Sequence, residues 1–229
     1  MIRALQAVVL DFDGVIANSE PLHLQAFQQA LDEEHIALTA QDYYAKYLGY
    51  DDVGMFEALA KDRRIAMSGG HVTALVVRKG ERMQEMLRSG TVLFPGATEF
   101  IREAAAAVPI AIASGAMRHE IEEVIDAAGV SDLFATIVAA GDTPQSKPSP
   151  APYRLALERL RETSGRDIDP RRAVAIEDSK WGLESAQGAG LRLVGVTNSY
   201  PAHELTGAEL VVDSLTALTL PALDRLCAS

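Results

Sequence analysis

Short apolar runs alternate with helical periodicity in the second half of the chain. The runs are rich in Val, Ile, Leu and Ala and predict strands at residues 108–113, 135–139, 173–176, 193–196 and 210–212. Between them, apolar positions recur at helical spacing over residues 97–107, 117–128, 150–162 and 181–188. Strands that alternate with helices in this way indicate a parallel sheet that is covered by helices on both faces.

The first ninety residues combine one more strand with a long helical region. Residues 5–10 form an apolar run that predicts a buried strand of the same sheet. From Pro21 to about Ser89 the apolar spacing is helical, and Gly49, Gly54 and the pair Gly69-Gly70 interrupt it. The predicted fold class is therefore α/β: a doubly wound, Rossmann-like parallel sheet formed by residues 1–17 and 91–229. A small α-helical cap is inserted at residues 18–90, with hinges near Asn18 and Gly90.

Composition excludes several classes of protein. The 229 residues carry a formal net charge of -11 without clustered Lys and Arg, so no nucleic-acid partner is expected. No run of eighteen apolar residues occurs, which predicts no membrane span. Cys227 is the single cysteine, so we expect neither a disulfide nor a cysteine zinc site and favour a reducing, cytoplasmic location. The acidic charge also means that an anionic substrate needs local cations.

Acidic pairs follow two of the predicted strands. In open parallel sheets the ligand site lies at the carboxyl ends of the strands. Asp11 and Asp13 follow the first strand and suit a carboxylate nucleophile and an acid/base for phosphoryl transfer. Glu177 and Asp178 follow the strand at 173–176, and together with Asp11 they suit Mg²⁺. Acidic turns and helix caps are the alternative interpretation of both pairs.

Candidate anion-binding groups follow two other strands. Ser114 and Gly115 precede a predicted helix, where a hydroxyl and backbone N–H groups form an anion site. Lys147 is followed by two prolines, Pro148 and Pro150, which restrict the backbone around it, so its ammonium is presented rigidly to a phosphate. The alternatives are a helix cap for Ser114 and a solvated surface lysine for Lys147.

The order of these residues along the chain resembles the motif pattern of a known family. Their series resembles the four motifs of the haloacid dehalogenase superfamily: Asp11-Phe12-Asp13-Gly14, Ser114, Lys147 and Glu177-Asp178. The run from Asp13 to His23 is similar to the β-phosphoglucomutase-like branch, which includes sugar-phosphate phosphatases. The resemblance covers nearly the whole chain and agrees with a helical cap inserted after the first motif.

The resemblance implies a role for each motif. Asp11 attacks phosphorus and becomes phosphorylated, while Asp13 protonates the leaving oxygen and then activates water. Ser114 and Lys147 bind the phosphoryl oxygens. Mg²⁺ is held by the residues that supply oxygen at this edge: Asp11, the backbone carbonyl of Asp13, Asp178 and Glu177.

Two cap residues are further candidates for the substrate site. His23 matches a histidine that links cap and acid/base in the family, and an ordinary helix histidine is the alternative. Lys79 is a candidate from the last cap helix, although a solvated helix face is the favoured interpretation. In the cap loop, Leu48 and Asp52 occupy the positions of a lysine and an arginine of the mutase pattern. A second phosphate would meet a carboxylate there, which disfavours the mutase.

The predicted function is a Mg²⁺-dependent phosphatase acting on a small phosphorylated metabolite, with a sugar phosphate preferred, through an aspartyl-phosphate. One alternative is a β-phosphoglucomutase-like mutase, which needs a second anion site in the cap. The other alternative is a non-catalytic protein that binds a phosphorylated metabolite. The chain is expected to be a monomer or a weak homodimer.

Overall fold

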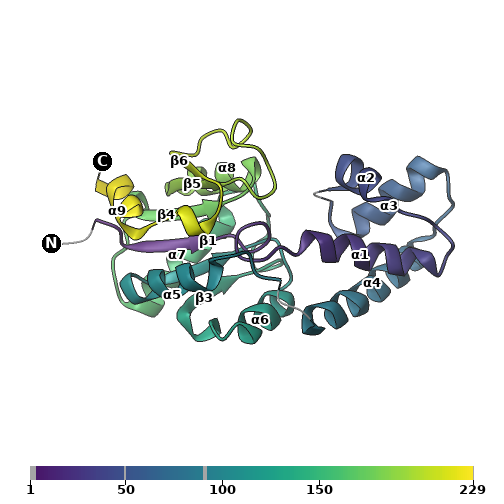
Figure 1. Cartoon of the computed structure of the whole chain (residues 1–229), viewed down its shortest axis with the longest axis horizontal. Helices are drawn as coiled ribbons and strands as arrows, with labels where there is room; N and C mark the ends of the chain where they lie inside the picture. The colour runs from purple at the N-terminus through teal and green to yellow at the C-terminus, as the bar shows by residue number, and fades with distance from the viewer. Residues whose placement is uncertain (1–3, 49, 90–91, 229) are drawn as a thin grey trace. The chain divides into compact units, whose positions relative to one another are not determined.

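The chain folds into two compact units. The structure is a computed structural model that describes residues 4–48, 50–89 and 92–228. One unit comprises Met1–Asn18 and Thr91–Ser229, and the other comprises Ser19–Gly90 (Figure 1). The predicted domain boundaries at residues 17/18 and 90/91 stay predictions, and Gly90 lies outside the described residues, as does Gly49.

The larger unit contains a fully parallel sheet. Within the described residues it has six strands in the order β3-β2-β1-β4-β5-β6. Their bounds are β1 Ala7–Leu10, β2 Ile110–Ala113, β3 Phe134–Val138, β4 Ala173–Glu177, β5 Arg192–Val196 and β6 Leu210–Val212. The strand order reverses direction between β1 and β4, which is where open α/β sheets bind ligands. The predicted doubly wound parallel sheet is confirmed.

The register brings the carboxyl ends of the central strands to one edge. Leu10 of β1 pairs with Ile112 of β2 and with Ile176 of β4. All residues of β1, β2 and β4 are buried, as expected for strands that are covered on both faces. The residues that follow Leu10 and Ile176 therefore emerge next to each other.

Helices cover the sheet, as the apolar periodicity predicts. They are α5 Ala97–Ala107, α6 Arg118–Ala127, α7 Ala151–Ser164, α8 Lys180–Gly188 and α9 Leu220–Ala228. Helix α7 packs on β2 and β3, and α8 packs on β5 (Figure 1). Short 3-10 turns occur at Ser131–Leu133, Pro170–Arg172 and Leu215–Ala217. The sequence prediction omitted α9, a nine-residue helix with a proline at its second position.

The smaller unit is helical, which confirms the predicted helical insert. It contains α1 Glu20–Asp32, α2 Ala40–Asp42, a π-helical turn at Tyr43–Tyr47, α3 Asp52–Arg63 and α4 Gly69–Ser89. Phe27 of α1 and Phe56 of α3 meet edge to face in its core, with ring centroids 5.2 Å apart. We expected Gly54 to interrupt the helical spacing, but it lies in the first turn of α3. There its N–H donates to the Asp51 side chain at 2.7 Å.

Across the described residues, we find no helix that is both long enough and apolar enough to cross a bilayer.

Candidate active site

Three buried carboxylates meet at the carboxyl edge of the sheet. They come from the ends of β1 and β4: Asp11, Glu177 and Asp178. One oxygen of each lies within 4.8 Å of the others. Their exposed fractions are 8%, 0% and 6%, respectively. Carboxylates this deeply buried require cationic partners or hydrogen-bond donors, so the arrangement marks a site that binds positive charge.

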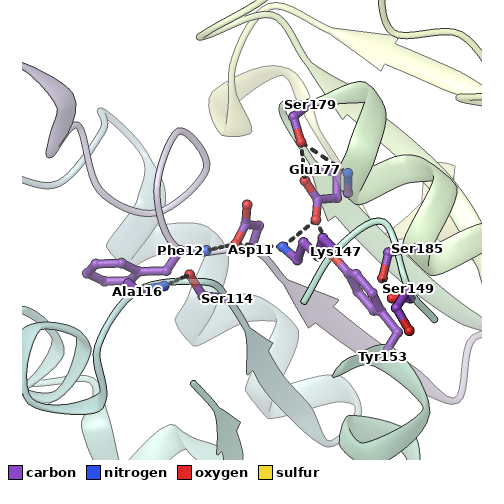
Figure 2. A network of polar contacts seen from close by, with 11 residues as sticks. Asp11, Phe12, Ser114, Ala116, Lys147, Ser149, Tyr153, Glu177, Ser179 and Ser185 are labelled. Atoms are coloured by element: carbon purple, nitrogen blue, oxygen red, sulfur yellow. Dashed lines mark hydrogen bonds and ion pairs between the residues drawn. The ribbon is translucent and has the colours of Figure 1, made fainter. Parts of the chain in front are cut away.

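Asp11 is held by one of its two carboxylate oxygens. Its N–H donates to the Ile176 carbonyl at 3.0 Å, which extends the sheet pairing one residue beyond β1. Its Oδ1 accepts the Phe12 N–H at 2.7 Å and lies 2.9 Å from the Lys147 Nζ. The other oxygen points away from both donors (Figure 2). The side chain is thus fixed through one oxygen, while the other accepts neither of these two hydrogen bonds.

Lys147 is shared between two of these carboxylates. Its Nζ lies 2.9 Å from Asp11 Oδ1 and 2.6 Å from Glu177 Oε1. Burial alone would lower the pKa of Lys147, but the two neighbouring carboxylates outweigh burial and raise it. The ammonium is therefore charged, and the predicted convergence of Lys147 with the acidic residues is observed.

The negative charge of the three carboxylates that Lys147 does not compensate suits a hard divalent cation. Burial raises the pKa of Glu177 to about 7, with a further contribution from the charge of Asp11. Burial and the charges of Asp11 and Glu177 also raise the pKa of Asp178, although its carboxylate accepts a hydrogen bond from Ser199. Crowded oxygen donors are the ligand set that Mg²⁺ and Ca²⁺ prefer. The residues present therefore fit a metal site.

This crowding predicts a pH-dependent stability in the presence of EDTA. The folded pKa of Glu177 lies above its ordinary value of 4.5, so between pH 4.5 and about 7 the native state holds a proton that the unfolded chain releases. The free energy of unfolding should therefore fall as pH rises through this window, by about 1 kcal/mol per pH unit. Urea unfolding at several pH values measures it.

Added Mg²⁺ should reverse that loss. A ligand at one hundred times its dissociation constant stabilises the native state by about 2.7 kcal/mol. The stabilisation should increase as the pH rises, because the metal competes with protons for these carboxylates. A metal-free protein whose stability stays flat from pH 4.5 to 7, and which Mg²⁺ does not stabilise, would contradict the predicted metal site.

Two glycines make room for the acidic side chains. Gly14 has a positive φ of 77°, and a Cβ there would lie 1.7 Å from Asp178 Oδ2. A Cβ on Gly182, in the first turn of α8, would lie 2.0 Å from the Glu177 carboxylate carbon. The Asn198 side chain also donates to the Gly14 carbonyl at 2.7 Å. The loops after β1 and β5 and the start of α8 are thus closely fitted around the carboxylates.

Ser114 is buried at the end of β2 and does not cap α6. Its Oγ accepts the Ala116 N–H at 3.0 Å, whereas α6 begins at Arg118, preceded by Met117 as N-cap. A Cβ on Gly115 would meet nothing within 4 Å, so the main chain there is open. The predicted role of Ser114 and Gly115 in binding phosphate stays a prediction.

The Asp13 carboxylate is not a member of the three-carboxylate cluster. Its backbone forms a bridge with Ala17, and its side chain is half-buried. Among the described residues, the cluster comprises Asp11, Glu177 and Asp178, without the Asp13 carboxylate. A metal contact through the Asp13 backbone carbonyl, as the resemblance implies, stays a prediction.

The expectation of a solvated Lys79 is wrong. Lys79 is 1% exposed within the helical unit, and its Nζ lies 2.9 Å from both Asp52 Oδ1 and His23 Nδ1. The ammonium also lies 5.1 Å from the centre of the Phe27 ring. Burial, with the charge of Lys79, lowers the pKa of His23 to about 3, so this histidine is neutral. The Lys79 ammonium can be buried because contacts with Asp52, His23 and the Phe27 ring replace its hydration.

Several residues that contact the site or the segment carrying Lys147 are not among those that the sequence predicts. Tyr153 donates to Glu177 at 2.6 Å, and Ser185 donates to the Ser149 carbonyl at 2.5 Å. Tyr153 lies on the apolar stripe of α7, so its pattern indicates only a core residue. The sequence does not indicate a role for Gly182 either. The lack of space for a Cβ at this position is apparent only when α8 is packed against Glu177.

Comparisons with known proteins agree with this geometry. The profile of the family "Haloacid dehalogenase-like hydrolase" matches residues 8–196. The chain is 32% identical to the protein CbbY of Rhodobacter capsulatus, over 97% of this chain and 99% of that protein. It is 28% identical to the phosphorylated carbohydrates phosphatase of Thermotoga maritima, over 85% of this chain and 87% of that protein.

Solved structures of CbbY from Rhodobacter sphaeroides resemble the fold. The structure with phosphate has a TM-score of 0.83 at 29% identity and covers 96% of this chain and 99% of that one. A mutant in complex with xylulose-1,5-bisphosphate has a TM-score of 0.81 at 29% identity, covering 93% and 96%. The family match spans both the first motif and the end of β5, and it contains all the residues of the carboxylate cluster. The chain therefore belongs to the haloacid dehalogenase-like hydrolase family, as its motifs predict.

Proposed function

We propose that the chain is a Mg²⁺-dependent phosphatase that hydrolyses a small phosphorylated sugar or related metabolite through an aspartyl-phosphate on Asp11. The observation that carries the proposal is the arrangement of Asp11. One of its oxygens is tethered by Phe12 and Lys147, and the other points away from these donors. A buried, oriented carboxylate beside a charged lysine suits nucleophilic attack on a phosphate ester.

Each step of the proposed reaction uses a group of this chain. The untethered oxygen of Asp11 attacks phosphorus, and the bond from phosphorus to the ester oxygen breaks. Asp13 gives its proton to that leaving oxygen and then takes a proton from the water that attacks the aspartyl-phosphate, which releases inorganic phosphate and restores Asp11. Lys147, Ser114 and the Gly115 N–H hold the phosphoryl oxygens.

The metal has a supporting place in this proposal. Asp11, Asp178, Glu177 and the backbone carbonyl of Asp13 would hold it. When bound, the ion supplies positive charge that offsets the charge of the phosphoryl group and of the carboxylates around it. Lys147 supplies the other positive charge, already fixed between Asp11 and Glu177 at 2.9 and 2.6 Å. These local positive charges attract a phosphate ester to the site although the chain as a whole carries a net charge of -11.

The relatives support a sugar phosphate as the substrate. A CbbY structure holds xylulose-1,5-bisphosphate, and a second relative is a phosphatase of phosphorylated carbohydrates. We therefore propose a phosphorylated sugar of similar size for this chain. A cytoplasmic location and a monomeric or weakly dimeric state stay predictions.

Phosphate release from a panel of sugar phosphates and small-acid phosphates tests the function. We expect release in Mg²⁺, a loss of roughly a hundredfold or more in EDTA, and full recovery when Mg²⁺ is restored. Both mono- and bisphosphates of five- and six-carbon sugars belong in the panel, with phosphoglycolate as the small acid.

Two outcomes of the same assay would contradict the proposal. Conversion of a sugar 1-phosphate to its 6-phosphate in the presence of the bisphosphate, with little free phosphate, would identify a mutase. Saturable binding of a sugar phosphate without turnover, in Mg²⁺, would identify a non-catalytic binding protein.

A further inference from the structure

We propose that Tyr153 and Ser185 are positioning residues whose buried hydroxyl groups hold Lys147 in place for the phosphoryl group. We call these two hydroxyl groups the lysine brace. The inference rests on the proposed role of Lys147 in binding phosphoryl oxygens. It adds two residues that the motifs of the family resemblance do not include.

Tyr153 fixes the carboxylate that orients the lysine. Glu177 Oε1 accepts two hydrogen bonds, from the Tyr153 hydroxyl at 2.6 Å and from the Lys147 ammonium at 2.6 Å (Figure 2). These two donors use both lone pairs of that oxygen. The Tyr153 ring also lies below the ammonium, with Nζ 5.4 Å from the ring centre. The carboxylate of Glu177 therefore cannot rotate without breaking a bond to one of its donors.

Ser185 fixes the backbone that carries the lysine. This residue of α8 is fully buried, and its Oγ donates to the Ser149 carbonyl at 2.5 Å. Ser149 follows Lys147 by two residues, and prolines at 148 and 150 restrict the chain between them and α7. The bond from Ser185 thus ties the lysine segment to the helix that follows Glu177. One hydroxyl group holds the side-chain partner of Lys147, and the other holds its main chain.

Core packing explains the ring of Tyr153 but not its hydroxyl. The ring belongs to the apolar cluster between α7 and the sheet, where a phenylalanine would fill the same space. A buried hydroxyl costs free energy unless it is hydrogen-bonded, and this one is bonded to the carboxylate that holds Lys147. The same reasoning applies to Ser185, for which an alanine would fit. Both hydroxyl groups therefore serve the lysine.

Tyr153→Phe and Ser185→Ala in the full chain test the brace. Lys147 contacts phosphoryl oxygens in substrate and transition state alike, so a displaced lysine weakens both equally. We expect each variant to raise KM, and the inhibition constant for inorganic phosphate, by roughly ten- to a hundredfold in Mg²⁺, with kcat nearly unchanged. A hydroxyl group that only supports the fold would instead lower the amount of active enzyme, seen as a lower kcat at unchanged KM.

Two matched variants control for the loss of a hydrogen-bonded hydroxyl group. Ser164→Ala removes a serine bond to a backbone carbonyl, that of Leu160 at 2.5 Å, at the far end of α7. Its KM should equal that of the wild type. Tyr43→Phe removes a tyrosine bond to a carboxylate, Glu20 at 2.5 Å, in the helical unit. Its unfolding free energy gives the cost to the fold of losing such a bond. Unchanged KM and phosphate inhibition in both brace variants would overturn the inference.

A structural readout separates failure of the brace from failure of the proposed function. If the wild type hydrolyses no phosphate ester, the proposed function fails, and crystal structures of the wild type and Tyr153→Phe then decide on the brace. We expect the variant to show a rotated Glu177 carboxylate and a longer distance between Lys147 and Asp11. An unchanged distance would overturn the brace, whether or not the enzyme is active.

Discussion

Asp11→Asn is expected to abolish phosphate release, with a loss of roughly 10⁴-fold or more in kcat. The amide keeps the size of the side chain and can still accept hydrogen bonds from Phe12 and Lys147, so the site should keep its shape. It lacks the charged oxygen that attacks phosphorus. Phosphate release from the best substrate of the panel, in saturating Mg²⁺, measures the effect. A fully active Asp11→Asn enzyme would contradict the assignment of the nucleophile.

The same variant should be more stable than the wild type in EDTA. Asp11 contributes to the raised pKa values of both Glu177 and Asp178, so its negative charge destabilises the metal-free cluster. Neutralising it relieves that repulsion, and urea unfolding at neutral pH should show a higher free energy of unfolding. Asp13→Asn is the matched control. It should also lose activity but should lack the gain in stability, because its carboxylate lies outside the cluster.

The fold follows from patterns that are local in the sequence. The continuous apolar runs of β1, β2 and β4 identify buried parallel strands, since both faces are covered. Predicted strand and helix ends deviate by only a few residues, and α5 has the predicted bounds. Helix α9 is not predicted because it is short and carries Pro221 in its first turn. It also follows the last predicted strand, so it does not lie between two strands as the other predicted helices do.

The convergence of the site residues was also predictable, for a reason of geometry. Parallel strands place their carboxyl ends at one edge, so residues that follow different strands must meet there. The pairing of Leu10 with Ile176 realises this, and it brings Asp11 next to Glu177. The identity of each hydrogen-bond partner was not predictable, because it depends on which helix packs where.

Lys79 and Tyr153 illustrate what sequence patterns leave undetermined. A lysine in an amphipathic helix has the same pattern whether it faces solvent or is paired with an aspartate from another helix, as Lys79 is with Asp52. A tyrosine on an apolar stripe packs like a phenylalanine. The hydroxyl group of Tyr153 is explained only by its hydrogen bond to Glu177. Both cases require tertiary contacts between residues that are distant in sequence.

Gly182→Ala is expected to lower kcat/KM by roughly a hundredfold or more. Alanine at an ordinary helix position is more favourable than glycine by about 1 kcal/mol, so intrinsic helix propensity predicts a gain in stability. At Gly182 a Cβ would lie 2.0 Å from the carboxylate carbon of Glu177 and 2.0 Å from its Oε2. The carboxylate must then move and take Lys147 with it, and a misplacement of about 1 Å can cost roughly a hundredfold, which appears here in kcat/KM through a higher KM.

Gly80→Ala separates helix propensity from the close contact at Gly182. Gly80 lies inside α4, and a Cβ there would meet nothing within 4 Å. This control should raise the free energy of unfolding by up to about 1 kcal/mol and leave kcat/KM unchanged. Gly182→Ala should instead lower both the free energy of unfolding and kcat/KM. If Gly182→Ala behaves like Gly80→Ala, Glu177 can shift without consequence, and the close fit of α8 against this carboxylate is not what holds the lysine in position.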